Sequence, residues 1–119
     1  MMKPIHTEIS DSVLQFAPES GPLSFAITVY NNSDQFASFQ VVLVAAGVDV
    51  NQRDWYRLSP SVSAKIPPGA ETCFQAHLLS VPPVPGGFTG TMNLTVRVYS
   101  TELRNEDRKD LRLIITGEG

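Results

Sequence analysis

The side chains best suited to binding a ligand lie between positions 54 and 60, in the run Asp-Trp-Tyr-Arg-Leu-Ser-Pro. Trp55 and Tyr56 offer broad ring faces, and Arg57 adds a cation beside them. Exposed in a loop, these groups could stack on a sugar or a peptide. In the alternative interpretation, which we favour, Trp55 is the only tryptophan of the chain and closes one end of a hydrophobic core, while Pro60 starts the next strand.

Charged residues gather between Glu102 and Arg112, where four acidic and four basic side chains nearly cancel. Such a segment could dock a charged partner with salt-dependent affinity, and Arg104 and Arg108 are its candidate contact residues. A solvated hairpin tip explains the same composition. We favour that explanation, because exposed ion pairs contribute only about 0–1 kcal/mol each.

Metal ligands are sparse in this sequence. Asp49, Asn51 and Asp54 supply oxygen atoms within a short segment, but calcium loops need more ligands, a turn glycine and a bidentate acid at fixed offsets. His6 and His77 are isolated imidazoles, which do not make a zinc site. The sequence therefore predicts neither a metal nor another cofactor.

Nucleophilic catalysis needs a serine or cysteine beside a base and an orienting acid, and no such motif occurs. Cys73 lies four residues from His77 on one predicted strand, about 13 Å away by strand rise and too far for direct proton transfer. Gly86-Gly87 follows prolines and opens no helix, so a phosphate-binding loop is not expected. The sequence predicts a protein that is not an enzyme.

Charge and length limit the remaining classes. Nine basic and twelve acidic residues give a net charge of −3, which disfavours nucleic acid and anionic lipid as partners. The amino end lacks a secretory signal, and no apolar run approaches the ~20 residues of a membrane span. The compartment is thus undetermined and cytoplasmic by default. With 119 residues, the chain fits one domain over 1–119 with a loose amino terminus, about 1–8.

Alternation of apolar and polar residues with period two dominates the chain and predicts strands. Leu23, Phe25, Ile27 and Val29 share one face of such a strand. The predicted strands lie near 13–16, 23–30, 39–44, 62–66, 74–78, 91–99 and 111–115.

Three details of this arrangement can be tested. Val42 and Val44 are apolar on the outward side of their strand, which predicts a central strand covered on both faces. The inward set Val62, Ala64 and Ile66 precedes Pro67-Pro68-Gly69, which predicts a tight hairpin to the following strand. The segment 81–87 is expected to connect two strands.

About seven short strands without a helical pattern predict an all-β fold, an immunoglobulin-like β-sandwich with two antiparallel sheets. A barrel is the alternative. The strand ending in Val29-Tyr30-Asn31-Asn32-Ser33, the segment from Trp55 to Pro60, the turn Ile66-Pro67-Pro68-Gly69 and the late Arg97-Val98-Tyr99-Ser100 together resemble bacterial immunoglobulin-like accessory domains of the NEW3/CARDB type. The resemblance spans roughly residues 20 to 116 and implies a spacer, scaffold or interaction module without shared catalytic residues.

Two functions follow from these observations. The first is a noncatalytic structural or protein-interaction domain, an accessory module and the amino-terminal part of a larger protein. Its partner would be a protein or a neighbouring domain, held at open sheet edges or loop ends. The second is a carbohydrate-binding module that stacks sugars on Trp55 and Tyr56, with Tyr30 or Tyr99 as further members. The candidate contact residues for the two are Trp55, Tyr56, Arg57, Arg104 and Arg108.

Overall fold

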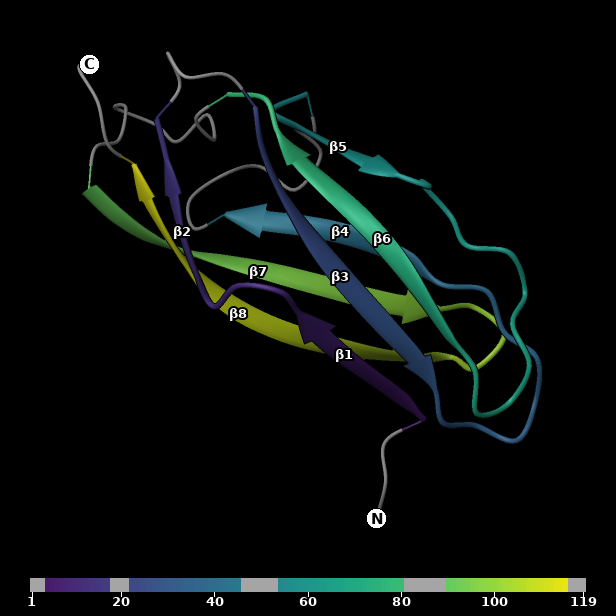
Figure 1. Ribbon diagram of the computed structural model, residues 1–119. Coiled ribbons are helices and arrows are strands. Elements are labelled where there is room, and N and C mark those ends of the chain that lie inside the picture. The colour runs from purple at the N-terminus through teal and green to yellow at the C-terminus, as the bar shows by residue number, and fades with distance from the viewer. Residues whose placement is uncertain (1–3, 18–21, 46–53, 81–89, 116–119) are drawn as a thin grey trace.

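The computed structural model describes residues 4–17, 22–45, 54–80 and 90–115, which form a two-layer β-sandwich (Figure 1). Its strands are β1 (Ile5–Ile9), β2 (Val13–Phe16), β3 (Leu23–Asn31), β4 (Gln40–Ala45), β5 (Tyr56–Ser59), β6 (Glu71–Leu78), β7 (Gly90–Ser100) and β8 (Asn105–Ile115). Sheet A has the order β1-β3-β6-β5 and sheet B the order β2-β8-β7-β4. Within these ranges, no helix is long and apolar enough to cross a membrane.

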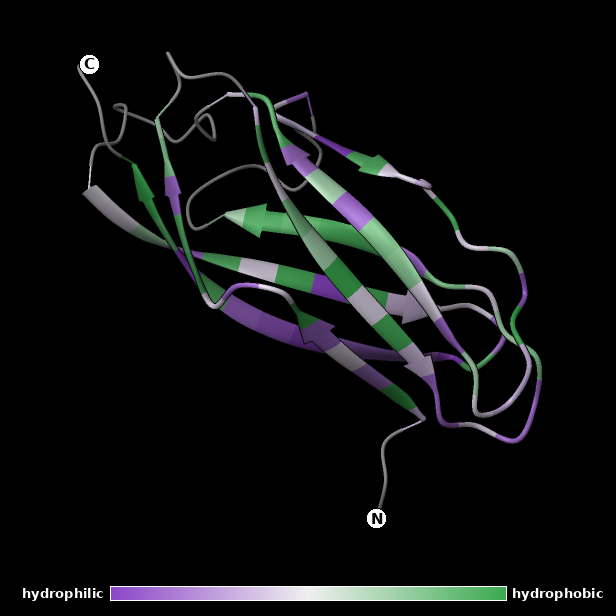
Figure 2. Ribbon diagram, in the orientation of Figure 1, coloured by the Kyte–Doolittle hydropathy of each residue, from purple (hydrophilic) through white to green (hydrophobic). Residues whose placement is uncertain are grey.

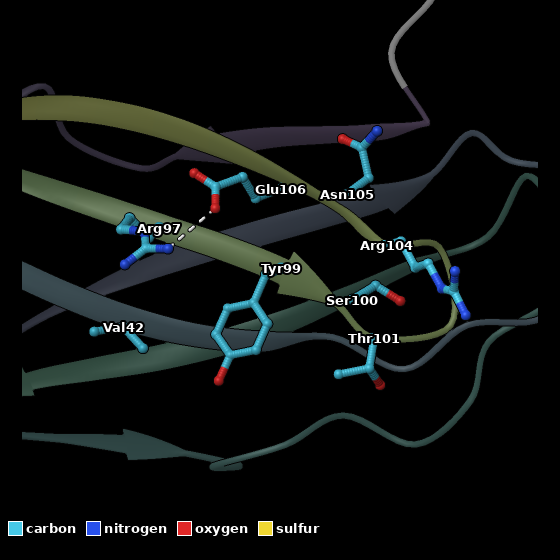
Figure 3. Close-up of a pocket in the computed structure, with 8 residues that line it drawn as sticks. All are labelled: Val42, Arg97, Tyr99, Ser100, Thr101, Arg104, Asn105 and Glu106. Carbon is cyan, nitrogen blue, oxygen red and sulfur yellow. Dashed lines mark hydrogen bonds and ion pairs between the residues drawn. The ribbon is translucent and has the colours of Figure 1, made fainter.

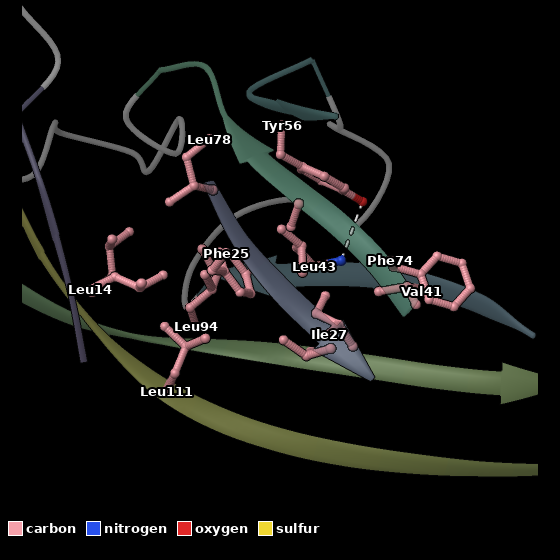
Figure 4. Close-up of a cluster of buried hydrophobic side chains, with 14 of the residues drawn as sticks. Leu14, Phe25, Ile27, Val41, Leu43, Tyr56, Phe74, Leu78, Leu94 and Leu111 are labelled. Carbon is pink, nitrogen blue, oxygen red and sulfur yellow. Dashed lines mark hydrogen bonds between the residues drawn. The ribbon is translucent and has the colours of Figure 1, made fainter. Parts of the chain in front are cut away.

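Side chains that alternate along the strands build the core between the sheets. On β3, Phe25, Ile27 and Val29 are buried, whereas the residues between them are half-buried. Figure 2 shows that hydropathy alternates along this strand. The long strands β7 and β8 follow the same alternation. The inner faces of the two sheets interdigitate in one apolar cluster (Figure 4). The predicted β-sandwich, with its strands near 23–30, 74–78 and 91–99, is therefore confirmed.

At each side of the sandwich, a described segment of the chain reaches from one sheet to the other. On one side, β1 pairs with β3 in sheet A and the next strand, β2, pairs in parallel with β8 in sheet B. On the other side, β5 pairs with β6 in sheet A, and the chain then bridges to sheet B through Val62, opposite Gln40. The edge strands contain four to six residues, whereas the inner strands contain eight to eleven. Short edges are poor templates for adding a foreign strand.

The prediction that the Val42 strand is central is wrong, because β4 is an edge strand of sheet B. Val42 is nevertheless buried on the outer face, at 6% exposure. Arg97 lies directly opposite it on β7, and the aliphatic stem of an arginine can cover such an apolar side chain. Local apolarity on both faces thus reports burial, but not the place of a strand in the sheet.

Two more strand predictions are corrected. Ile5–Ile9 is a strand rather than part of a loose terminus, and its alternate residues Ile5 and Thr7 are buried. Tyr56–Ser59 is also a strand, where a loop is expected. Both segments are short, so their pairing with longer neighbours decides their conformation.

The segment 62–66 was assigned the wrong inward set. Ser63 is buried and Val62 is 44% exposed, because the chain meets the edge of β4 through isolated bridges rather than a regular strand. The turn at Gly69, with φ of 80°, carries the chain from that edge to sheet A. It therefore joins the two layers, and the tight hairpin predicted here does not form. The predicted connection over 81–87 lies outside the described residues.

Candidate functional site

Two adjoining hollows open on the outer face of sheet B, beside its β4 edge. The larger has a volume of about 760 Å3 and the smaller about 300 Å3. Val42 and Tyr99 line both, so we treat the two hollows as one feature and call it the Tyr99 groove (Figure 3). The larger hollow is lined by Val42, Arg97, Tyr99, Ser100, Thr101, Arg104, Asn105 and Glu106. The smaller is lined by Gln40, Val41, Val42, Tyr56, Leu58, Ser61, Val62 and Tyr99.

Pairing between β4 and β7 places the groove's central residues. Gln40 lies opposite Tyr99 in this ladder, and Val42 lies opposite Arg97. Because side chains at every second position share a face, Val42, Arg97 and Tyr99 all stand on the outer side of sheet B. The crossing segment after β5 then supplies Val62 from beyond the sheet edge. The groove therefore combines an apolar floor with a polar rim.

Glu106 is held between two arginines at the rim. Its carboxylate accepts a hydrogen bond from Nε of Arg108 at 2.7 Å and another from Arg97 at 3.0 Å. These bonds, that from Arg108 first, lower the pKa of Glu106 below its usual value. Arg97 Nε is buried and has no hydrogen-bond partner among the described residues. The single acid thus engages two cations and leaves donor capacity unused.

Arg104 stands at the opposite end of the larger hollow, in the turn between β7 and β8 (Figure 3). The backbone φ angle of Arg104 is 51°, in the left-handed region. Residues other than glycine and asparagine adopt this region only at a cost in conformational energy. The turn is anchored by Glu102, whose carboxylate accepts hydrogen bonds from the hydroxyl of Ser38 at 3.0 and 3.1 Å and of Ser100 at 3.1 Å. No carboxylate of the described ranges pairs with Arg104.

The five candidate contact residues from the sequence do not form one surface. Trp55 is 1% exposed and Tyr56 is 7% exposed. Their rings pack edge to face within the core, with 4.6 Å between the ring centroids. Arg57 lies on the outer face of sheet A, opposite His77. Arg104 and Arg108 lie at sheet B. Arg104 lines the larger hollow of the groove, and Tyr56 lines the smaller one.

The stacking platform for sugars is therefore corrected. Trp55 closes the core, as the favoured interpretation predicts. Its large apolar ring is more stable when buried than when exposed to water in a loop. The two remaining members, Tyr30 and Tyr99, stand on outer faces of different sheets. Tyr56 and Tyr99 both line the smaller hollow, but Trp55 is buried and Tyr30 lies on the other sheet, so the four rings do not form one stacking surface.

Sequence reasoning missed Arg97, Val42 and the central position of Tyr99. The available signal is the outward position of Arg97 and Tyr99 on the predicted strand 91–99. This alternation does not reveal that β4 and the segment near Val62 lie beside these residues, because that arrangement depends on pairing between distant segments.

The outer face of sheet A carries a serine–histidine pair that sequence spacing did not predict. Ser24 Oγ lies 2.7 Å from Nδ1 of His77, across the β3–β6 ladder. Within the described part of the chain, no carboxylate hydrogen-bonds to His77, and the pair lines neither hollow of the Tyr99 groove. Asp49 and Asn51 of the weak metal candidate fall outside the described residues, and Asp54 is exposed.

No protein-family model matches the chain, and no curated protein matches it in sequence. Solved structures do. A FixG-related protein from Vibrio parahaemolyticus superimposes with a TM-score of 0.69 at 10% identity, over 98% of this chain and 100% of that one. The E. coli chaperone DraB gives 0.54 at 11% identity, over 93% and 55%. A chain of the Salmonella enterica SafA pilin complex with the SafB chaperone gives 0.56 at 11%, over 99% and 57%.

These similarities establish the fold. The chain is an immunoglobulin-like β-sandwich, a fold that it shares with the FixG-related protein and the chaperone DraB. It spans little more than half the length of the chaperone chains that it matches. At such low identities, the likeness defines the class of domain and leaves its partner to be argued from the groove.

Proposed function

We propose that this chain is a noncatalytic protein-interaction domain that binds an extended segment of another protein in the Tyr99 groove. The observation that carries the proposal is the groove itself: two adjoining hollows on the outer face of sheet B, with Val42 and Tyr99 at their junction. Ligand-binding sites on proteins are commonly hollows that combine apolar walls with a few polar groups.

The fold supports this proposal by analogy. Domains of this fold occur in the chaperone DraB, and one of the matched structures is the SafA pilin in complex with the SafB chaperone. The short edge strands of this chain make a face groove a better docking place than strand addition.

The accessory role belongs to the same proposal. An interaction domain of the NEW3/CARDB type would act as one module of a larger protein and would bring a partner to it. Its chemistry would be recognition alone, which agrees with a serine–histidine pair that lacks an orienting acid among the described residues.

A selection experiment tests the proposal. A displayed library of random segments of roughly a dozen residues is selected on the immobilised protein, because an extended peptide of that length can cross a sheet face. The selected segments are synthesised, and their binding is mapped by amide chemical-shift changes. We expect the shifts to gather on β4, β7 and the segment near Val62.

Two variants provide the matched comparison. Tyr99→Ala should lower the affinity for the selected peptides by about tenfold or more, since buried aromatic contacts dominate peptide docking. Tyr30→Ala removes a tyrosine from the outer face of sheet A and should leave their affinity unchanged. Equal affinities in both variants, or shifts confined to sheet A, would overturn the proposal. Thermal unfolding of each variant checks that the fold is intact.

A further inference from the structure

We infer that the segment bound in the Tyr99 groove is acidic and carries one apolar side chain between its carboxylates. This inference rests on the proposed function and names the chemistry of its partner. It follows from the arrangement of charge around the groove, which differs from that of the chain as a whole.

The acids around the groove are already engaged by this chain. Glu106 accepts hydrogen bonds from Arg97 and Arg108, and Glu102 accepts them from Ser38 and Ser100. On the neighbouring part of the face, Asp110 accepts a hydrogen bond from Thr95 at 2.7 Å. The carboxylates therefore offer little to a partner.

The cations, in contrast, have unused capacity. Arg104 pairs with no carboxylate of the described residues, and Arg97 and Arg108 share the single carboxylate of Glu106. A guanidinium holds a carboxylate through several donors at once. A patch with spare positive charge on a protein of net charge −3 is complementary to an acidic partner.

The positions of these groups set the order of residues in the partner. Arg97 and Arg104 lie toward opposite ends of the larger hollow with Tyr99 between them, and Val42 lies on β4 opposite Arg97 (Figure 3). An extended segment crossing here would place an apolar side chain against Tyr99 and Val42. Acidic side chains before and after it would reach the two arginines.

Arg104 adds an independent observation. It occupies a left-handed backbone position, where glycine or asparagine would fit with less strain. Strained positions of this kind gather at binding sites. Replacing this residue should therefore weaken binding while making the fold more stable, which is the opposite of what a structural role predicts.

Three synthetic peptides test the inference on the intact chain. Each contains one central phenylalanine, flanked by glutamates, by serines or by lysines, and binding is followed by fluorescence anisotropy. At about 50 mM salt, the glutamate peptide should bind about tenfold more tightly than the serine peptide, and the lysine peptide most weakly. At about 500 mM salt, the difference should shrink to about threefold or less, because ions screen exposed charges.

Variants then locate the effect. Arg104→Gly should weaken the glutamate peptide about fivefold and raise the temperature of unfolding. Arg104→Glu should shift the preference toward the lysine peptide. Arg57→Ser, which removes one arginine from the outer face of sheet A, makes the same change in net charge as Arg104→Gly and should leave the affinity within about twofold.

The outcomes separate this inference from the proposed function. If the serine peptide binds as tightly as the glutamate peptide and Tyr99→Ala weakens both, the acidic preference is wrong and the groove still binds protein segments. If Tyr99→Ala changes the affinity of neither peptide, the proposed function and the acidic preference are both overturned. A single-stranded oligonucleotide that displaces the glutamate peptide at lower concentration than the unlabelled peptide itself would also overturn the inference, in favour of nucleic acid.

Discussion

Tyr56 Oη accepts a hydrogen bond of 3.3 Å from the backbone N–H of Leu43, which joins the first residue of β5 in sheet A to the edge strand of sheet B (Figure 4). The N–H points away from β7 and would otherwise be a free edge donor. Tyr56 therefore helps to close the exposed side of β4, next to the smaller hollow that it also lines.

Removing this hydroxyl should destabilise the domain measurably. Tyr56→Phe is expected to lower the free energy of unfolding by about 1–2 kcal/mol, because a buried donor loses its partner. Urea denaturation measures the change, and faster hydrogen exchange at the Leu43 amide locates it. Tyr30→Phe, whose hydroxyl donates to the exposed Glu8 at 3.0 Å, is the control and should change stability by less than about 0.5 kcal/mol. Equal effects would show that the edge contact is unimportant.

Asn31 stabilises the corner after β3. Its side-chain amide donates to the carbonyl oxygens of Gln35 at 2.9 Å and Ile66 at 3.0 Å, and its Oδ1 accepts from the N–H of Ser33 at 3.1 Å. Asn31→Ala should cost about 2–3 kcal/mol, since several groups lose their partners at a buried site. The neighbouring Asn32 is exposed. Asn32→Ala should lower the free energy of unfolding by less than about 0.5 kcal/mol. Chemical denaturation of the two variants would refute the assignment if they lose similar stability.

Stability should fall at acidic pH. The pKa of Glu102 is lowered by a hydrogen bond from its own backbone amide and then by the Ser38 hydroxyl, and that of Glu106 is lowered by Arg108 and then Arg97. Since both values lie below the unfolded value of about 4.3, this stabilisation is fully present above that pH and is lost as pH falls through the folded pKa.

The temperature of unfolding, measured from neutral pH downward, checks this expectation. Glu102→Gln should flatten the decline in the acidic range, because the variant has no carboxylate to protonate there. The exposed Asp34→Asn serves as the control and should keep the wild-type slope. A wild-type slope in Glu102→Gln as well would rule out the contribution of this carboxylate.

Trp55 reports on the core directly because it is the only tryptophan. At 1% exposure, its emission should be blue-shifted relative to the unfolded chain and poorly quenched by iodide or acrylamide. Ready quenching in the native protein would contradict the buried position and restore the ring to the list of binding residues.

The sequence predicted the inward faces of most strands. Phe25, Ile27 and Val29 alternate with polar or small residues, and this local period fixes which side chains the sheet buries. The same alternation occurs in Ile5-His6-Thr7-Glu8-Ile9, where the buried Thr7 weakens the apolar signal of a strand. Arg104 was recognised as a candidate contact, although nothing local placed it beside Tyr99.

The sequence by itself determined an all-β sandwich without a recognisable catalytic motif, since alternation and turn residues act over a few neighbouring positions. Only the tertiary structure decided that β4 would be an edge strand, that Trp55 and Tyr56 would turn inward, and that Val42, Tyr99 and Arg104 would surround one groove. The physical reason is that strand neighbours are selected by pairing between distant segments, where packing and backbone hydrogen bonds of the whole sheet outweigh any local preference.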